Sequence, residues 1–256
     1  MLSNIIEIII LSIVQGISEF LPISSSAHLN IVEVIFKFNS SSLMIDVSLH
    51  LGSLLAIIFY FRKELLDLRN NQKLLSLLII GSVPIVIAGY IISSTGLINL
   101  LENNLKIIAW TTLVFGIILY LADKCKFNKE MSSDLNFKTI LYIGLFQMLA
   151  LIPGVSRAGI TITAARLFRF NRFDSSKISF LLAIPAIAGA SVLQLKNAIG
   201  QSLEFNYLIL ISITLSFIFS YFTVKFFLDY INKFSLNIFV IYRIIISIVL
   251  FIIIYN

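Results

Sequence analysis

The chain has 256 residues, of which 59% are hydrophobic and only 12% are charged, and its formal net charge is +6. A soluble domain has about a quarter of its residues charged, so this composition places the chain in a lipid bilayer. The cations fall in short blocks between apolar runs, which indicates membrane orientation and not nucleic-acid binding. The single cysteine, Cys125, excludes an internal disulfide.

The first segment of the chain, MLSNIIEIIILSIVQ, has the apolar character of a signal peptide. It lacks a basic start and a small-residue cleavage pattern, and it contains Glu7. We therefore expect this segment to be retained.

Apolar runs that are long enough to cross a bilayer follow along the chain, since a crossing helix needs about 20 apolar residues. These runs lie at 45–62, 74–93, 105–122, 178–195, 207–225 and 238–255. Two further apolar regions, 4–37 and 138–166, are too long for one span. Proline and small polar residues interrupt both, as LPISSS and IPGVSRAG. The pattern predicts an all-α polytopic membrane protein with six transmembrane helices and two broken elements.

The distribution of Lys and Arg predicts the orientation, because connections rich in these residues stay in the cytoplasm. The rich connections are 62–73, 123–138, 166–177 and 225–237, and the others contain only Lys37, Lys106 and Lys196. The segment between 123–138 and 166–177 must then enter and leave from the cytoplasm, as a re-entrant hairpin that turns at Pro153-Gly154. Region 4–37 is either a hairpin entered from outside or one long tilted helix. We favour the hairpin, which places both termini outside.

An internal repeat supports that choice. The spans that start near 45, 74 and 105 recur near 178, 207 and 238, and the same shift of about 133 residues brings Pro22 within two residues of Pro153. Each unit holds three spans and one hairpin, which is an odd number of crossings, so the second copy is inverted. We predict one membrane domain, 1–256, with inverted repeats at about 4–122 and 138–255. In such architectures the site lies where the broken helices meet, near the bilayer midplane.

The first break combines an acid, hydroxyls and a base. Glu19 lies four residues after Gln15, so the two share a helix face, and His28 follows beyond Pro22 and the serines. Ionisable residues at membrane depth are costly and usually functional. Glu19 with Gln15 offers oxygen ligands for Mg²⁺ or Ca²⁺. Ser25 or Ser24 offers a nucleophile, and His28 offers a base or acid. The alternative makes Glu19 a surface residue and the serines a plain helix cap.

The second break has the residues expected of an anion site. Ser156 and Arg157 follow Gly154, and Thr161 comes one turn later. Glycine permits a close backbone approach, the amides that open the next helix suit an anion, and the Arg157 guanidinium matches phosphate oxygens. Arg157 could instead extend to the cytoplasmic face, but a re-entrant tip makes this less favourable. Together the breaks predict a site for phosphate chemistry in which Arg157 stabilises the developing charge.

Some polar residues keep two interpretations. Arg243, inside the last span, either reaches the polar cavity and binds substrate or forms hydrogen bonds between helices. His50 and Asp46 either support the site or are packed in the core. The sequence contains no Walker A loop, HExxH motif, Cys/His metal pattern or GxSxG motif.

Two separate motifs resemble two motifs of one family and occur in the same order. QGISEFLPISSSAHL is similar to the (E/Q)xxxE segment, and PGVSRAGITIT to the PGxSRSxxT segment, of the undecaprenyl-diphosphatases, the bacitracin-resistance phosphatases of bacterial envelopes. The resemblance extends along most of the chain, including FQMLALIPG, FLLAIPAIAGA and the late IYR. It implies cation-dependent dephosphorylation of undecaprenyl diphosphate at the outer side of the cytoplasmic membrane, which recycles the lipid carrier for wall polymers. It also implies six spans with two re-entrant elements in inverted repeat.

The resemblance also implies roles for single residues. By motif position, Gln15 and Glu19 form the metal-binding pair, and Ser25 and His28 are catalytic. The residues implied to hold the diphosphate are Ser156, Arg157 and Thr161, to which we add Ser24, Gly154 and Arg243 as substrate-binding candidates. Which of Ser25 and His28 attacks phosphorus stays open, as does homodimer formation.

The chain departs from the family pattern at three places. Gln15 is allowed by the pattern but brings one charge fewer for the metal, Ala158 stands where the motif usually has Ser, and SSSAH replaces the commoner SSTGH.

Two other functions compete with the phosphatase. A transporter or flippase of polyprenyl phosphate would use the same architecture and Arg157, but it needs no nucleophile or proton-transfer partner such as Glu19 with His28. The other large class of membrane lipid phosphatases has a histidine after its SR segment. Here the only histidines are His28 and His50, which excludes that class.

Overall fold

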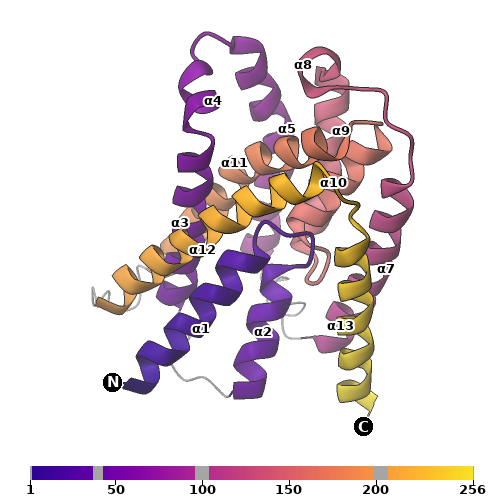
Figure 1. The fold of residues 1–256 in the computed structure, drawn as a ribbon. Coiled ribbons are helices and arrows are strands. Elements are labelled where there is room, and N and C mark those ends of the chain that lie inside the picture. The colour runs from indigo at the N-terminus through magenta and orange to yellow at the C-terminus, as the bar shows by residue number, and fades with distance from the viewer. Residues whose placement is uncertain (1, 37–42, 96–103, 199–206, 256) are drawn as a thin grey trace.

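The computed structural model describes residues 2–36, 43–95, 104–198 and 207–255. Within these ranges the chain forms helices and a single isolated β-bridge (Figure 1). The elements, in chain order, are α1 (Leu2–Ser18), α2 (Ser25–Phe36), α3 (Leu43–Tyr60), α4 (Arg62–Asp67), α5 (Gln72–Thr95), α7 (Leu105–Asp123), α8 (Met131–Asp134), α9 (Phe137–Gln147), the 3-10 helix η1 (Met148–Leu151), α10 (Arg157–Leu167), α11 (Arg172–Ala198), α12 (Tyr207–Ile231) and α13 (Asn237–Tyr255).

Six of the described helices, α3, α5, α7, α11, α12 and α13, are long and apolar enough to cross a membrane. Their bounds match the six predicted spans, so the all-α fold with six candidate transmembrane helices is confirmed. The largest differences are at the end of α12, which is Ile231 and not near residue 225, and at the start of α11, which is Arg172 and not near residue 178. The first turns of α11 are polar, so a search for apolar runs does not include them. The Asn171 side chain accepts from the amide of Asp174 at 2.8 Å and caps the start of the helix.

The two broken regions form helix pairs, as predicted. The chain between α1 and α2 breaks at 19–24, and the chain between η1 and α10 breaks at 152–156. The residue before each second helix, Ser24 and Ser156, has a positive φ (76° and 72°), which is rare for a residue with a side chain. Figure 1 shows that the break between α1 and α2 lies near the middle of the molecule. The re-entrant character of the pairs and the inverted repeat stay predictions.

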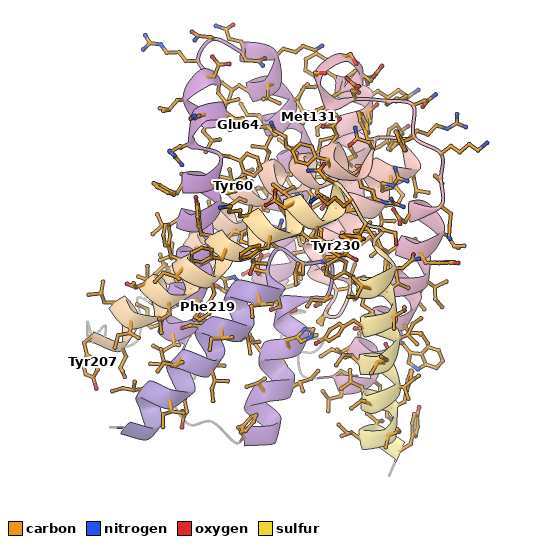
Figure 2. All side chains as sticks on the ribbon, in the orientation of Figure 1. Tyr60, Glu64, Met131, Tyr207, Phe219 and Tyr230 are labelled. Atoms are coloured by element: carbon orange, nitrogen blue, oxygen red, sulfur yellow. The ribbon has the colours of Figure 1, made fainter. Side chains whose placement is uncertain are left out.

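The connections rich in Lys and Arg lie together. The α3–α5 connection with α4, and the α7–α9 connection with α8, are at one end of the molecule in Figure 1. Figure 2 shows nitrogen-tipped side chains reaching outward at that end. The described ends of α1 and α13 lie at the opposite end. Lys37, Met1 and Asn256, which entered the orientation argument, lie outside the described residues.

Small residues let the helices of the two halves pack closely. α1 packs against α12 and α9 against α5, while α3 packs along α12 and α7 along α13. A side chain at Gly16 would meet the Cβ atom of Phe219 at 2.5 Å, and one at Gly144 would meet the carbonyl of Gly81. Hydroxyl groups also join α12 to α3, since Ser216 donates to the Leu49 carbonyl at 2.6 Å. Such small and hydroxylated contacts are typical of helix packing in membranes.

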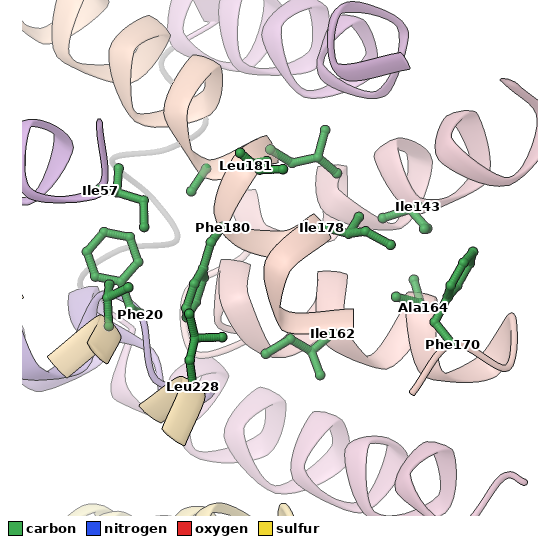
Figure 3. Close-up of a cluster of buried hydrophobic side chains, with 14 of the residues drawn as sticks. Phe20, Ile57, Ile143, Ile162, Ala164, Phe170, Ile178, Phe180, Leu181 and Leu228 are labelled. Carbon is green, nitrogen blue, oxygen red and sulfur yellow. The ribbon is translucent and has the colours of Figure 1, made fainter. Parts of the chain in front are cut away.

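An apolar core passes through both halves and holds the first break in place (Figure 3). Phe20, next to Glu19, is fully buried and packs edge-on against Phe180 of α11, with 5.4 Å between ring centroids. Ile162 of α10 belongs to the same core. The two breaks are therefore fixed by one packed interior.

At the end that carries α4 and α8, a buried ion pair joins several helices. Asp123, at the end of α7, accepts from Nε and Nη2 of Arg172 at 2.7 and 3.0 Å and from the Leu236 amide at 3.2 Å. Arg166 donates to the carbonyls of Asp123, Cys125 and Phe170 at 2.6–2.9 Å. Every bond in this cluster serves packing, and we assign it no chemistry.

The Gly144–Gly81 contact predicts a stability difference between two similar substitutions. Gly144→Ala pushes a methyl group into the backbone of α5, so we expect a loss of about 1–3 kcal/mol in unfolding free energy. Gly189→Ala is the matched control, because its added methyl would lie 3.9 Å from the nearest atom, Cγ2 of Val86. It should be neutral, or stabilising by up to about 1 kcal/mol. Thermal unfolding in detergent measures both, and equal midpoints would contradict the packing argument.

Candidate active site

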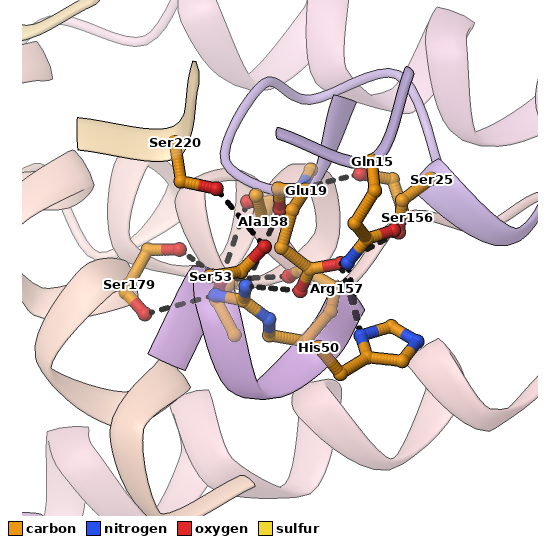
Figure 4. A network of polar contacts seen from close by, with 12 residues as sticks. Gln15, Glu19, Ser25, His50, Ser53, Ser156, Arg157, Ala158, Ser179 and Ser220 are labelled. Atoms are coloured by element: carbon orange, nitrogen blue, oxygen red, sulfur yellow. Dashed lines mark hydrogen bonds and ion pairs between the residues drawn. The ribbon is translucent and has the colours of Figure 1, made fainter. Parts of the chain in front are cut away.

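The two breaks meet at the carboxylate of Glu19, a buried residue that directly follows α1 (Figure 4). Its Oε1 atom accepts from Nη2 of Arg157, the first residue of α10, at 2.8 Å. Its Oε2 atom accepts from the Ser25 hydroxyl at 2.7 Å and from Nε2 of Gln15 at 3.1 Å. The structure thus brings together four residues that the sequence predicted for one site.

Local sequence explains how Glu19 and Ser25 come to face each other. The Glu19 amide still donates to the Gln15 carbonyl, as in a helix, but Pro22 has no N–H and ends the helical pattern. The chain then turns through Ser24, whose positive φ reverses its direction, and Ser25 opens α2. The hydroxyl of this first helical residue points back to the carboxylate.

Arg157 is held by α11 as well as by Glu19. Its Nη1 atom donates to the Ser179 carbonyl at 3.4 Å, and its guanidinium lies 5.7 Å from the centre of the Phe20 ring. Thr161 bonds the Ser179 hydroxyl at 2.6 Å and donates to the Arg157 carbonyl at 2.8 Å. Thr161, predicted to hold the diphosphate, therefore contacts Arg157 and its support. Because the Glu19 and Arg157 side chains are only 7% and 12% exposed, their pairing offsets a large desolvation cost.

Ser156 and Gly154 shape the start of α10. The Ser156 hydroxyl accepts from the Gly159 amide at 3.1 Å and caps the helix. Gly154 has φ +86°, and a side chain there would meet Oγ1 of Thr111 and the Ile108 carbonyl of α7. The conformational freedom of Gly154 is thus used for close packing on α7, where the sequence had suggested an approach to an anion.

Arg243 joins the two breaks from α13. The side chain is 1% exposed, and it donates to four backbone carbonyls. These carbonyls belong to Pro22 (3.2 Å) in the first break, Gly154 (2.9 Å) and Val155 (3.0 Å) in the second, and Thr112 (3.1 Å) in α7. Of the two interpretations left open by the sequence, these bonds correspond to hydrogen bonding between elements.

His28 lies on the first turn of α2, and its ring forms hydrogen bonds with Ser24 and Tyr242 and not with the Ser25 hydroxyl. Its Nδ1 atom donates to the Ser24 carbonyl at 2.6 Å, so Nε2 of the neutral ring accepts from the Tyr242 hydroxyl, also at 2.6 Å. The two rings are stacked with centroids 5.5 Å apart. Tyr242 was missed by the sequence argument, which noted only its place in the IYR segment beside Arg243.

His50 of α3 is part of the site, which decides between its two interpretations. Its Nδ1 atom is 2.9 Å from Nε2 of Gln15 and 3.8 Å from Oε2 of Glu19. The signal that could have placed it here was an ionisable side chain inside a predicted membrane span.

The donor set suits a divalent cation. Glu19 supplies a carboxylate, and Oε1 of the fully buried Gln15 has no hydrogen-bond partner, so an amide oxygen is available beside it. Hard cations such as Mg²⁺ often bind one or two protein oxygens and take their other ligands from water and phosphate. Within the described ranges, no three His, Cys, Asp or Glu side chains are grouped for a metal.

These features define a class of protein: a helical, multi-pass membrane protein with a buried acid, hydroxyl and arginine centre at the meeting of two broken helices. The chain matches the family described as bacitracin resistance protein BacA over residues 8–249, and it belongs to that family.

Similar curated proteins carry one name. The chain is 91% identical to the undecaprenyl-diphosphatase of Pelagibacter ubique (strain HTCC1062), over the full length of both chains. It is 40% identical to the undecaprenyl-diphosphatase of Elusimicrobium minutum (strain Pei191), with 96% of this chain and 97% of the relative covered. It is 38% identical to undecaprenyl-diphosphatase 3 of Bacillus cereus, with 93% of each covered. The resemblance seen in the two motifs is thereby confirmed.

The bonds of Arg243 predict a graded loss of stability. Arg243→Lys keeps the charge but has three donors for four carbonyls, and a buried carbonyl without a donor costs about 1–3 kcal/mol. We expect a loss of that size for Arg243→Lys and a larger one for Arg243→Met, measured by thermal unfolding in detergent. Arg62→Lys, at an exposed arginine with one bond to the Phe59 carbonyl, is the control and should change stability by less than about 0.5 kcal/mol. A loss as small for Arg243→Met would refute the joining role.

Proposed function

We propose that the protein hydrolyses undecaprenyl diphosphate to undecaprenyl phosphate and phosphate in the bacterial cytoplasmic membrane. The observation that carries the proposal is the Glu19 carboxylate, which binds the hydroxyl of Ser25 at 2.7 Å and the guanidinium of Arg157 at 2.8 Å. The groups proposed as base, nucleophile and phosphate-binding cation are thus in contact at the junction of the two breaks. The names of the full-length relatives support this substrate.

The contacts support a role for each group. The Ser25 hydroxyl already donates to Glu19, so Glu19 is placed to take its proton as Oγ bonds to the terminal phosphorus. The bridging P–O bond then breaks, the lipid leaves as its monophosphate, and water releases the phosphate from Ser25. Arg157 moves its donors from Glu19 to the phosphate oxygens and stabilises the charge that develops there.

His28 is the alternative attacking group, and the geometry favours Ser25. Both ring nitrogens of His28 are engaged, one by the Ser24 carbonyl and one by the Tyr242 hydroxyl. A ring held in this way suits proton transfer through Nε2 better than attack on phosphorus. Arg243 acts as a positioning residue, because its donors go to the backbone of both breaks.

Glu19 and Gln15 are the proposed ligands of Mg²⁺ or Ca²⁺, supported by the unpartnered Oε1 atom of Gln15. When bound, the ion would neutralise phosphate oxygens and align the diphosphate. Gln15 brings no charge of its own, so the affinity of the pair depends on what else lies beside it.

We further propose that the site opens to the outer side of the membrane and that both termini lie outside. The support is the Lys/Arg-rich end of the molecule, which carries α4 and α8 and lies opposite the described ends of α1 and α13 (Figure 1). Membrane lipids then surround the six spans, and homodimer formation stays open. A carrier or flippase for the same lipid gains no specific support, because a carrier has no use for the Ser25–Glu19 contact.

Phosphate release from undecaprenyl or farnesyl diphosphate by the purified protein, with Mg²⁺ or Ca²⁺, tests the activity. Glu19→Gln keeps the shape of the side chain but removes the base and the charge, so we expect a fall of about 10²-fold or more. Arg157→Lys loses the planar fork and should cost about 10²-fold.

The control for both is Glu64→Gln in α4, whose partner at 3.0 Å is Lys177 and which lies outside the site. It should keep the wild-type rate. Equal rates in all four proteins, or no release by any, would refute the phosphatase and favour the carrier.

The orientation is tested by cysteine labelling in a Cys125→Ser background, which removes the native thiol. Lys106→Cys lies at the start of α7, and Asn128→Cys lies in the α7–α8 connection, and both positions are exposed. We expect an impermeant maleimide added to intact cells to label position 106, and position 128 only after permeabilisation. The reverse pattern would overturn the orientation.

A further inference from the structure

His50 places an imidazole nitrogen where only oxygen ligands were expected. Its Nδ1 atom and Oε2 of Glu19 are 3.8 Å apart, and Nε2 of Gln15 lies between them, at 2.9 Å from the first and 3.1 Å from the second. An amide nitrogen can only donate, so both neighbours accept from it. Nδ1 of His50 therefore directs a lone pair into the site, which is the form of the ring that binds a metal.

The amide nitrogen of Gln15 lies between two acceptors, as a bound cation would. The NH₂ group of this amide donates to Oε2 of Glu19 and to Nδ1 of His50. The Oε1 atom of the same amide is buried without a hydrogen-bond partner. Rotation of the amide by half a turn would exchange the two atoms. Three acceptors, from Gln15, Glu19 and His50, would then face one point, and two of them are already within 3.8 Å of each other.

We propose that His50 supplies a nitrogen ligand to the divalent ion, so that the site holds it through Glu19, Gln15 and His50. The inference rests on the proposed function only in taking the ion to belong to that site. Mg²⁺ and Ca²⁺ prefer all-oxygen sites. Mn²⁺ binds the same oxygen ligands but, as a first-row transition ion, also accepts an imidazole nitrogen, although less strongly than Fe, Ni, Cu or Zn. The mixed donor set should therefore bind Mn²⁺ more tightly, relative to Mg²⁺, than an all-oxygen site would.

Access and charge agree with this assignment. The side chain of His50 is 25% exposed, against 7% for Glu19, so the imidazole lies on the more open side of the pair. Glu19 is already neutralised by Arg157 at 2.8 Å, and Gln15 adds no charge. A neutral nitrogen donor strengthens the site without a second buried carboxylate, which would need its own counter-charge.

The test is a spectroscopic one on Mn²⁺ bound to the purified full-length protein in detergent, carrying an affinity tag without histidine. Electron spin echo envelope modulation detects ¹⁴N of an imidazole bound directly to Mn²⁺, and it requires no turnover. The sequence has only two histidines, so His50→Gln and His28→Gln form a matched pair. We expect the wild type and His28→Gln to show the imidazole signal and His50→Gln to lose it.

A titration of free Mn²⁺ by its EPR signal gives affinities for the same proteins, with Mg²⁺ as competitor. His50→Gln should weaken Mn²⁺ binding by about tenfold or more while leaving Mg²⁺ competition nearly unchanged. Retention of the imidazole signal in His50→Gln, its loss in His28→Gln, or no Mn²⁺ binding at all would overturn the assignment. Phosphate release is measured separately on the wild type, so that failure of the His50 ligand and failure of the phosphatase remain distinct results.

Discussion

The structure depends on hydrogen-bond donors for the backbone carbonyls at its two helix breaks, which lie inside an apolar interior. A helix break leaves carbonyls without donors, and at membrane depth there is no bulk water to bind them. Arg243 supplies the donors: one buried guanidinium binds Pro22 in the first break and Gly154 and Val155 in the second. The same bonds that stabilise each break also fix the distance between them. The position of Glu19 relative to Arg157 is therefore set by a residue of the last helix, more than eighty positions away from either.

The Glu19–Arg157 ion pair turns this scaffold into a site. Each charge would be costly alone in this interior, so each needs the other while no substrate is present. A diphosphate and a divalent ion carry the same two kinds of charge. In the proposed reaction, the phosphate would take over Arg157 and the divalent ion would bind Glu19. With no ligand bound, the ion pair keeps the site assembled. Each proposed ligand would then replace one partner by a group whose charge has the same sign.

Most of the architecture could be predicted from the sequence, because its causes are local. Apolar runs gave six spans, the polar interruptions located both breaks, and the acid, hydroxyl and arginine of those breaks do meet. The predictions that stayed open concern residues whose partners come from distant elements. Tyr242 contacts His28 across 214 positions, and no periodicity in either helix indicates this pairing. Gly154 and Arg243 likewise have roles set by packing on α7 and by both breaks, which only the assembled fold defines.

The neutral Gln15 is understood in the same terms. In a pair of carboxylates, the second charge would have no counterpart, since Arg157 already serves Glu19 and Arg243 is used by backbone carbonyls. Gln15 instead donates to Glu19 and His50 and keeps the resting site neutral, at the cost of one charge for the ion. The proposed imidazole ligand at position 50 would add a donor without adding a charge, and it already lies in one hydrogen-bonded triad with Gln15 and Glu19.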